Sequence, residues 1–310
     1  MNILQLEEVV KTYDKTVAVD HVSFSIPKGR VFGLLGPNGA GKTSLIRIIT
    51  SITRADSGQL FFDGEPLKSI HSERIGYMPE ERGLYKKMKV GEQLLYLAQL
   101  KGLEYRDARD RLRQWMTRFE IMSWWNKKVD ELSKGMQQKV QFISTVVHEP
   151  DLLILDEPFS GLDPINTNLI KSEIRELNRQ GISIIFSTHR MEQVEEMCEE
   201  IVLINNGRNV LTGEVKEIRE RFKENIFSIE YSGNLPVELD ALDFENQQFS
   251  IISKEDHSLR IKVEQGGDSN DLLRFLIQKG VHIISFKEVL PTINDIFIRV
   301  VEGDKTRDEG

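Results

Sequence analysis

Short apolar runs alternate with turn-forming residues through the first third of the chain and again through its middle. Residues 3–11 and 17–26 are rich in Val, Ile and Phe and are separated by a polar turn, so they predict two paired strands. The continuous apolar run at 152–155 is typical of a strand buried on both faces of a parallel sheet. Further short strands are predicted at 30–35, 59–62, 74–78, 182–186 and 201–211, the last of these as a hairpin.

Between these stretches the apolar residues adopt the spacing of an α-helix. They recur three or four positions apart over 90–100, 104–119 and 133–147, which predicts three amphipathic helices in an insert between two α/β stretches. Another helix is predicted after Asp163, which precedes Pro164 as an N-cap residue precedes a proline in the first helical position.

The last part of the chain has a different organisation. A charged helix is predicted at 214–224, and strand-like and helix-like runs then alternate up to residue 302. The pattern therefore predicts an α/β domain over 1–220, with its helical insert at about 88–150. A small α+β accessory domain is predicted over 221–310, and it shows no catalytic constellation.

The segment between the third strand and the following helix fits the phosphate-loop pattern G-x-x-x-x-G-K-[ST] at every fixed position. Glycines let successive backbone N–H groups point at phosphate oxygens, and the helix that follows adds the positive end of its dipole. The lysine ammonium can reach the β- and γ-phosphates, and the threonine hydroxyl can ligate Mg²⁺. The sequence thus predicts that ATP or GTP binds at Gly36, Pro37, Asn38, Gly39, Ala40, Gly41, Lys42 and Thr43.

Two carboxylates end the apolar run at 152–155. Asp156 at the strand end can hold Mg²⁺, and Glu157 faces the other way and can polarise an attacking water. His189 follows the next strand, at the edge where α/β sheets bind ligands. Ser133 and Gly135 open the third helix of the insert, where Ser133 acts either as an ordinary N-cap or as part of an anion site that faces a second subunit.

Composition narrows the class of protein. The 310 residues carry a formal net charge of -8, which argues against nucleic acid as the main partner. No run approaches the roughly 18 apolar residues of a membrane span, and the first residues show no basic-then-apolar leader, so a soluble, cytoplasmic chain is expected. Cys198 is the only cysteine, so no internal disulfide forms.

In this order, the motifs resemble those of the ATP-binding subunits of ABC transporters, over residues 3 to about 220. The resemblance implies a P-loop cassette, with a RecA-like α/β core, an antiparallel β subdomain and an inserted helical subdomain, that binds ATP and Mg²⁺. It makes 36–43 the Walker A motif and 152–157 the Walker B motif, and it makes His189 a switch histidine that contacts the γ-phosphate. Nucleotide contacts are also implied for Tyr13, which would stack on adenine, for Ser44, and for Asp163 of the D-loop at 160–163.

Two positions depart from the family pattern. The signature helix of the family usually begins Leu-Ser-Gly-Gly-Gln, and here Lys134 and Met136 replace a glycine and the glutamine, while Ser133 and Gly135 remain. After the strand at 74–78, Glu80 takes the place of a glutamine. Its carboxylate can accept from a water or ligate Mg²⁺, but it adds negative charge near the metal.

The resemblance also implies partners. Two cassettes would close head to tail over two ATP molecules, as a homodimer or as a heterodimer with a similar cassette. A separate multi-span membrane permease would dock near residues 80–105, which would place the chain at the cytoplasmic face of the membrane. Residues 79–85 and 291–297 resemble those of sodium-exporter cassettes and so suggest export, with ions, drugs and peptides all open as cargo.

Three other interpretations remain open at this point. One is a soluble ABC-type ATPase that acts on a non-membrane partner, although one cassette without a long coiled coil fits the types considered poorly. Another is a GTPase, because 126–130 superficially resembles a guanine-reading motif, although its acid falls one position late. The third is a protein that binds ATP without hydrolysis, which the intact Glu157 disfavours.

Overall fold

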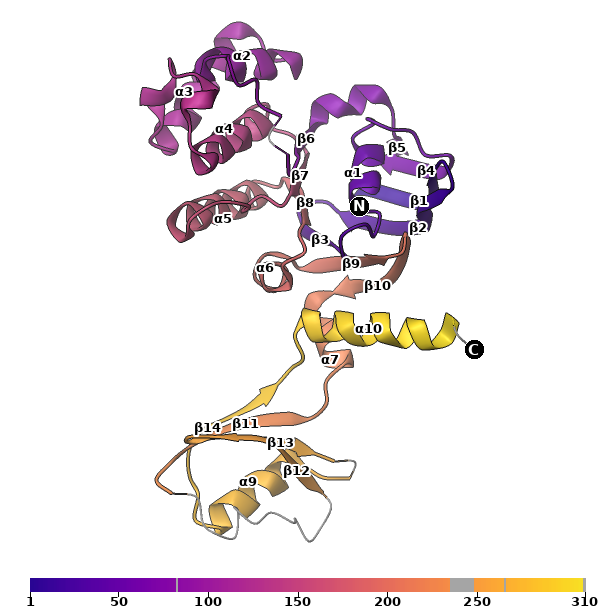
Figure 1. Cartoon of the computed structure of the whole chain (residues 1–310), viewed down its shortest axis with the longest axis vertical. Coiled ribbons are helices and arrows are strands. Elements are labelled where there is room, and N and C mark those ends of the chain that lie inside the picture. Colours follow the sequence, from indigo (N-terminus) through magenta and orange to yellow (C-terminus); the bar gives the residue numbers. More distant parts are fainter. Residues whose placement is uncertain (82, 235–247, 265, 309–310) are drawn as a thin grey trace. The chain divides into compact units, whose positions relative to one another are not determined.

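The computed structural model describes residues 1–81, 83–234, 248–264 and 266–308, and the chain divides into two compact units, Met1–Val215 and Lys216–Gly310 (Figure 1). In the described part of the first unit, a six-stranded sheet has the order β10-β9-β3-β8-β7-β6. The edge strand β10 is antiparallel to β9, and the other neighbours are parallel. Its strands are β3 (Val31–Leu35), β6 (Ile75–Met78), β7 (Leu152–Asp156), β8 (Ser183–Ser187), β9 (Glu200–Asn205) and β10 (Arg208–Glu214).

The register of this sheet brings three strand ends to one edge. Ser187, the last residue of β8, is opposite Leu34 of β3 on one side and Asp156 of β7 on the other. Because the strands are parallel, the chain leaves all three at the same edge, where α/β sheets bind ligands. The segments after β3, β7 and β8 carry the phosphate loop, the acid pair and His189, so these groups lie close together at this edge of the sheet.

A second, antiparallel sheet packs beside the first. Its order is β2-β1-β4-β5, and one cluster of buried side chains joins both sheets with the helix after the phosphate loop. Phe24 and Phe32, one from each sheet, stack with ring centroids 5.6 Å apart. The elements are β1 (Asn2–Tyr13), β2 (Thr16–Pro27), α1 (Lys42–Ile49), β4 (Ser57–Phe62), β5 (Glu65–Pro66) and the 3₁₀ turn η1 (Ser69–Arg74).

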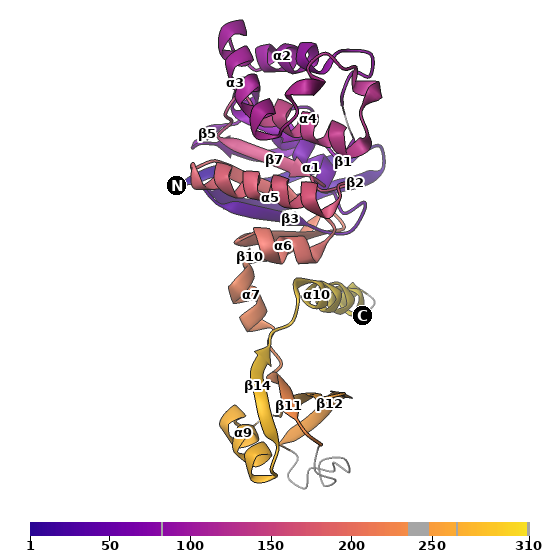
Figure 2. The ribbon, with the colours of Figure 1, turned by 90° about the vertical axis from the view of Figure 1, so that its left-hand side faces the viewer.

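Helices fill the interval between β6 and β7, as the pattern of the sequence predicts. They lie together at the top of Figure 2, above the strands of this unit. The rings of Phe119 and Phe142 pack between the second and third of these helices, with their centroids 5.8 Å apart. The insert contains α2 (Val90–Leu100), α3 (Tyr105–Arg118), the 3₁₀ turns η2 (Met122–Trp124) and η3 (Val129–Glu131), and α4 (Lys134–Val146). The remaining helices of the unit are α5 (Pro164–Arg179) and α6 (Met191–Met197).

The second unit has its own core. An antiparallel sheet of order β12-β13-β11-β14 buries its apolar face against a helix, and Phe227 and Phe286 stack there with centroids 5.0 Å apart. The described elements are α7 (Val215–Arg221), β11 (Ile226–Ser232), β12 (Phe249–Glu255), β13 (Ser258–Val263), α9 (Ser269–Gln278), β14 (His282–Val289) and α10 (Ile293–Asp308). These elements agree with the alternation of strand-like and helix-like runs that the sequence predicts for this part of the chain.

Candidate nucleotide-binding and hydrolysis site

The phosphate loop lies between β3 and α1, and two of its glycines occupy positions that no other residue could fill without strain. Gly36 has φ +147° and Gly41 has φ +108°, in the region that disfavours a Cβ atom. A Cβ atom on Gly36 would lie 2.2 Å from the Ile204 carbonyl oxygen, and one on Gly41 would lie 2.2 Å from that of Ala18. The loop therefore packs tightly against β9 and β2, and its conformation requires glycine at both positions.

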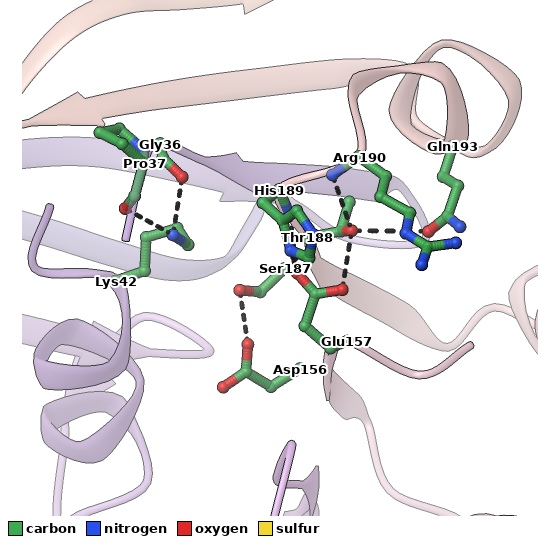
Figure 3. Close-up of polar contacts among 10 residues, drawn as sticks. All are labelled: Gly36, Pro37, Lys42, Asp156, Glu157, Ser187, Thr188, His189, Arg190 and Gln193. Carbon is green, nitrogen blue, oxygen red and sulfur yellow. Dashed lines mark hydrogen bonds and ion pairs between the residues drawn. The ribbon is translucent and has the colours of Figure 1, made fainter. Parts of the chain in front are cut away.

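The ammonium of Lys42 lies inside this loop. Its Nζ donates hydrogen bonds to the carbonyl oxygens of Gly36, at 2.7 Å, and Pro37, at 3.0 Å (Figure 3). Burial lowers the pKa of Lys42, and the nearby carboxylates of Asp156, Glu157 and Glu80 oppose that shift. The lysine is thus held inside the loop by two carbonyl contacts, which phosphate oxygens could replace.

The acid pair follows β7. Asp156 accepts a hydrogen bond from the Ser187 hydroxyl at 2.8 Å, while burial raises the pKa of its carboxyl group. Glu157 has φ +49°, a left-handed conformation that is uncommon for a residue with a side chain. Its backbone N–H donates to the Ser187 carbonyl oxygen at 2.8 Å, which fixes this turn. The turn sends the two carboxylates in different directions, and such local strain is often found at functional sites.

Residues after β8 surround the Glu157 carboxylate (Figure 3). Oε1 accepts from the backbone N–H of His189 at 2.7 Å and lies 2.6 Å from the ring Nδ1 of the same residue. Oε2 accepts from the Thr188 hydroxyl at 3.1 Å. Both oxygens are therefore oriented by the two residues that follow β8, and the side chains of Glu157 and His189 are in direct contact.

These groups line one cavity of about 230 Å³. It contains residues from the loop, from the segment after β6, and from the ends of β7 and β8, so it brings together most of the predicted site. Ala18 of β2 also lines it, a contact that sequence patterns do not indicate because it depends on how β2 approaches the loop. The lining residues are Ala18, Asn38, Gly39, Ala40, Gly41, Lys42, Thr43, Ser44, Glu80, Asp156, Glu157 and His189.

Three predicted residues lie in a different hollow, of about 470 Å³, at the start of α4 and α5. Ser133 caps α4 by accepting from the Met136 N–H at 3.3 Å, and Asp163 caps α5 by accepting from the Asn166 N–H at 3.0 Å. Gly135 lies with them, as does Lys134. Both capping predictions are confirmed, and the two motifs form a surface separate from the cavity that holds Lys42.

Tyr13 does not line the cavity. It ends β1, its side chain is exposed, and the Lys11 ammonium lies 5.5 Å from the centre of its ring.

Ser187 and Thr188 are the site residues that sequence reasoning missed. Their position between a buried strand and His189 was the available signal, but which acid each hydroxyl contacts depends on the pairing of β7 with β8.

The chemistry of the cavity fits a magnesium ion that is shared with a nucleotide. Within the described residues, no three His, Cys, Asp or Glu side chains are placed to hold a metal ion by themselves. Mg²⁺ on phosphates usually takes only one or two carboxylates and keeps several waters. The Thr43 hydroxyl and the carboxylates of Asp156 and Glu80, which line the same cavity, supply ligands of that kind.

Comparison with known proteins identifies the family. A family model described as "ABC transporter" matches residues 19–160. Over 301 residues the chain is 44% identical to an uncharacterised ABC transporter ATP-binding protein, YhaQ of Bacillus subtilis, with 96% of this chain and 98% of YhaQ covered. The chain belongs to the ATP-binding subunits of ABC transporters. Cassettes of this family hydrolyse ATP to power transport, so the chain is an ATPase and the GTPase interpretation is wrong.

Two more family models match parts of this ABC transporter subunit, and other relatives resemble it over most of its length. A model of the "ATP-binding protein DrrA1-3-like, C-terminal domain" matches 213–301, and one of an "AAA domain, putative AbiEii toxin, Type IV TA system" matches 128–193. The Nod factor export ATP-binding protein I of Burkholderia pseudomallei is 37% identical, with 68% of this chain and 70% of that protein covered. A solved ATP-binding subunit of an ABC transporter superposes with a TM-score of 0.67 at 29% identity, covering 71% of this chain and 93% of the other.

No helix in the described ranges is long and apolar enough to cross a membrane.

Proposed function

We propose that this subunit hydrolyses ATP to drive a separate membrane permease, and that the transporter is an exporter. The observation that carries the hydrolytic part is the cavity in which Lys42, Asp156 and Glu157 meet. Export is supported by similarity to a protein named for Nod factor export and by residues 79–85 and 291–297. The cargo would be selected by the permease, and ions, drugs and peptides all fit.

The roles of the residues follow from their placement. Backbone N–H groups of the loop and the Lys42 ammonium would bind the phosphates, which exchange for the carbonyl contacts of the lysine. Thr43, Asp156 and Glu80 would hold Mg²⁺, which neutralises charge on the phosphates when it is bound. Glu157 would accept the proton of the attacking water, and His189 would orient that carboxylate and contact the γ-phosphate.

Two cassettes would form the complete site. Ser133, Gly135 and Asp163 line a hollow of their own, so they would meet the nucleotide of a second subunit instead of that of their own cavity. The N-terminus of α4 offers backbone N–H groups to a γ-phosphate there. ATP would then hold a head-to-tail homodimer or cassette heterodimer shut, and hydrolysis would release it because the bridging phosphate is lost.

The permease would dock on the first unit, at a cavity that we call the docking groove. A cavity of about 460 Å³ lies between the insert and the core, lined by Leu84 and by Leu97 and Leu100 of α2. Tyr85, Tyr96 and Leu100 are exposed on the same stretch, and exposed apolar clusters commonly mark protein contacts. Docking here would hold the chain at the cytoplasmic face of the membrane, with the accessory domain at 221–310 supporting or regulating the dimer.

The decisive experiment uses Glu157→Gln, which keeps the size of the side chain and removes its basicity. The variant should bind ATP, lose at least about 100-fold in turnover, and form an ATP-dependent dimer by light scattering. Glu192→Gln, on the exposed face of α6, is the matched control and should hydrolyse ATP as the wild type does. Full turnover in Glu157→Gln would contradict the assignment.

The second candidate, an ABC-type ATPase with a non-membrane partner, makes a different prediction. Under the proposed function, part of the chain sediments with membranes of its source cells and stays bound after a salt wash. A chain that remains entirely in the supernatant would favour the second candidate, without affecting the assignment of Glu157.

A further inference from the structure

The docking groove contains buried polar atoms that have no hydrogen-bond partner. In the part of the chain that the structure describes, both ring nitrogens of His148 and Oε1 of Gln141 are in this state, with the residues 9% and 3% exposed. Both side chains line the cavity of about 460 Å³, which is otherwise mostly apolar. Buried polar groups in proteins are nearly always satisfied, so these atoms indicate an occupant that supplies the missing partners.

Lys101 brings a charge to the same cavity. Its Nζ donates to the carbonyl oxygens of Ser72, at 2.6 Å, and Ile75, at 2.9 Å, and one N–H remains. No carboxylate among the described residues lies within 4.0 Å of it, although Glu73 acts on it from farther away. Burial lowers the pKa of Lys101. Partly buried charges are usually paired, but no carboxylate of a described residue pairs with this one, which lines a mostly apolar cavity.

The surroundings of His148 keep its ring neutral. Burial is the main cause that lowers its pKa to about 4, and the Lys101 and Arg111 charges act in the same direction. Arg111 itself forms an ion pair with Glu149 at 3.0 Å, so its charge is already matched. The Ile75 carbonyl lies near the ring without forming a hydrogen bond of good geometry. A neutral imidazole has one N–H to donate, so His148 and Lys101 offer two donors close to the Ile75 carbonyl.

We propose that this cavity binds an acidic side chain of the membrane partner, with the carboxylate held between Lys101 and His148. The flanking apolar side chains of that segment pack on Leu97 and Leu100, and one of its backbone N–H groups satisfies Gln141 Oε1. This inference rests on the proposed function, because that function supplies the membrane partner. It adds the chemistry that selects the partner, a carboxylate within an apolar segment.

The chemistry is tested with three small probes that share one apolar group: 4-methylpentanoate, 4-methylpentanamide and 3-methylbutylamine. Binding to the full chain is followed by NMR of the probes in every variant, and by NMR of the labelled imidazoles wherever His148 is present. The carboxylate should bind about ten-fold more tightly than the amide and shift the His148 signals, since charge-assisted hydrogen bonds are the stronger ones. Lys101→Met and His148→Gln should each remove that preference, while Lys216→Met, at an exposed lysine outside the cavity, should keep it. Equal binding of the three probes, or preference for the amine, overturns the proposal.

The source of the carboxylate is tested with membranes of the source cells. Saturating 4-methylpentanoate should release bound wild-type chain where 4-methylpentanamide does not, and Lys101→Met should reduce the bound fraction about five-fold relative to Lys216→Met. Basal ATP hydrolysis and the thermal unfolding midpoint of each variant exclude general damage. If the probe binds and membrane retention is unchanged, the cavity takes a free anion and the proposal is wrong. If the wild type never binds membranes, the proposed function fails instead.

Discussion

Replacing His148 should change how the stability of the first unit depends on pH. Burial lowers the pKa of His148 from 6.5 to about 4, so the unfolded chain binds this proton at a higher pH than the folded chain does. The folded state therefore loses stability as the pH falls below about 6.5, and the loss levels off below about 4. A difference of two and a half pKa units corresponds to about 3 kcal/mol in full, and about 2 kcal/mol of it should appear between pH 7 and pH 5.

The measurement is urea unfolding at pH 7 and pH 5, followed by tryptophan fluorescence. The three tryptophans, Trp115, Trp124 and Trp125, all lie in the helical insert, so they report on the unit that contains His148. In His148→Leu, the drop in the free energy of unfolding from pH 7 to pH 5 should be about 2 kcal/mol smaller than in the wild type.

His282→Leu removes an exposed histidine and should retain the wild-type pH dependence. Every titratable group other than the replaced histidine is common to a variant and the wild type, so each comparison isolates one imidazole. If His148→Leu and the wild type lose the same stability between pH 7 and pH 5, the imidazole is not buried in neutral form. The proposed carboxylate site would then lack the neutral imidazole donor on which it depends.

Three further predictions concern the nucleotide site. Lys42→Ala should weaken ATP binding at least about ten-fold in calorimetry, because a charge-assisted contact to phosphate is lost, and unchanged affinity would count against the phosphate-loop assignment. Glu80→Gln should keep ATPase activity but shift the Mg²⁺ concentration for half-maximal binding of an ATP analogue, and identical metal titrations would remove any special role for this carboxylate. Gly41→Ala should destabilise the first unit by about 2 kcal/mol or more, because the added Cβ meets the Ala18 carbonyl oxygen at 2.2 Å. Gly64→Ala, also at positive φ but in open space, is its control and should cost about 1 kcal/mol, so equal losses would refute the contact argument.

Local structure was predictable from the sequence wherever the residues that form it are neighbours along the chain. The phosphate loop, the acid pair after β7 and the caps at Ser133 and Asp163 each depend on a few consecutive residues, and the structure has the corresponding elements. Strand and helix positions also followed from the spacing of apolar residues, within a few residues at each end.

Features that depend on distant pairing were not predictable in the same way. Ser187 contacts Asp156 because β7 and β8 are adjacent, and Ala18 reaches the phosphate loop because β2 crosses it. The position of Tyr13, outside the cavity, likewise depends on how β1 and β2 meet. His148 shows the limit most clearly, because nothing in its own neighbourhood along the chain reveals a buried imidazole without a partner.

The contacts made by the Glu157 carboxylate determine how many of its acceptor positions are open to an attacking water. Its two oxygens take three contacts, and an ionised carboxylate has about four acceptor positions, so one is left for a water. The backbone N–H cannot leave, but the His189 side chain is 56% exposed and can rotate away. Such rotations in exposed side chains take picoseconds to nanoseconds, so a second acceptor position can open without any domain moving. The number of waters that the carboxylate can hold would therefore depend on the rotamer of one histidine.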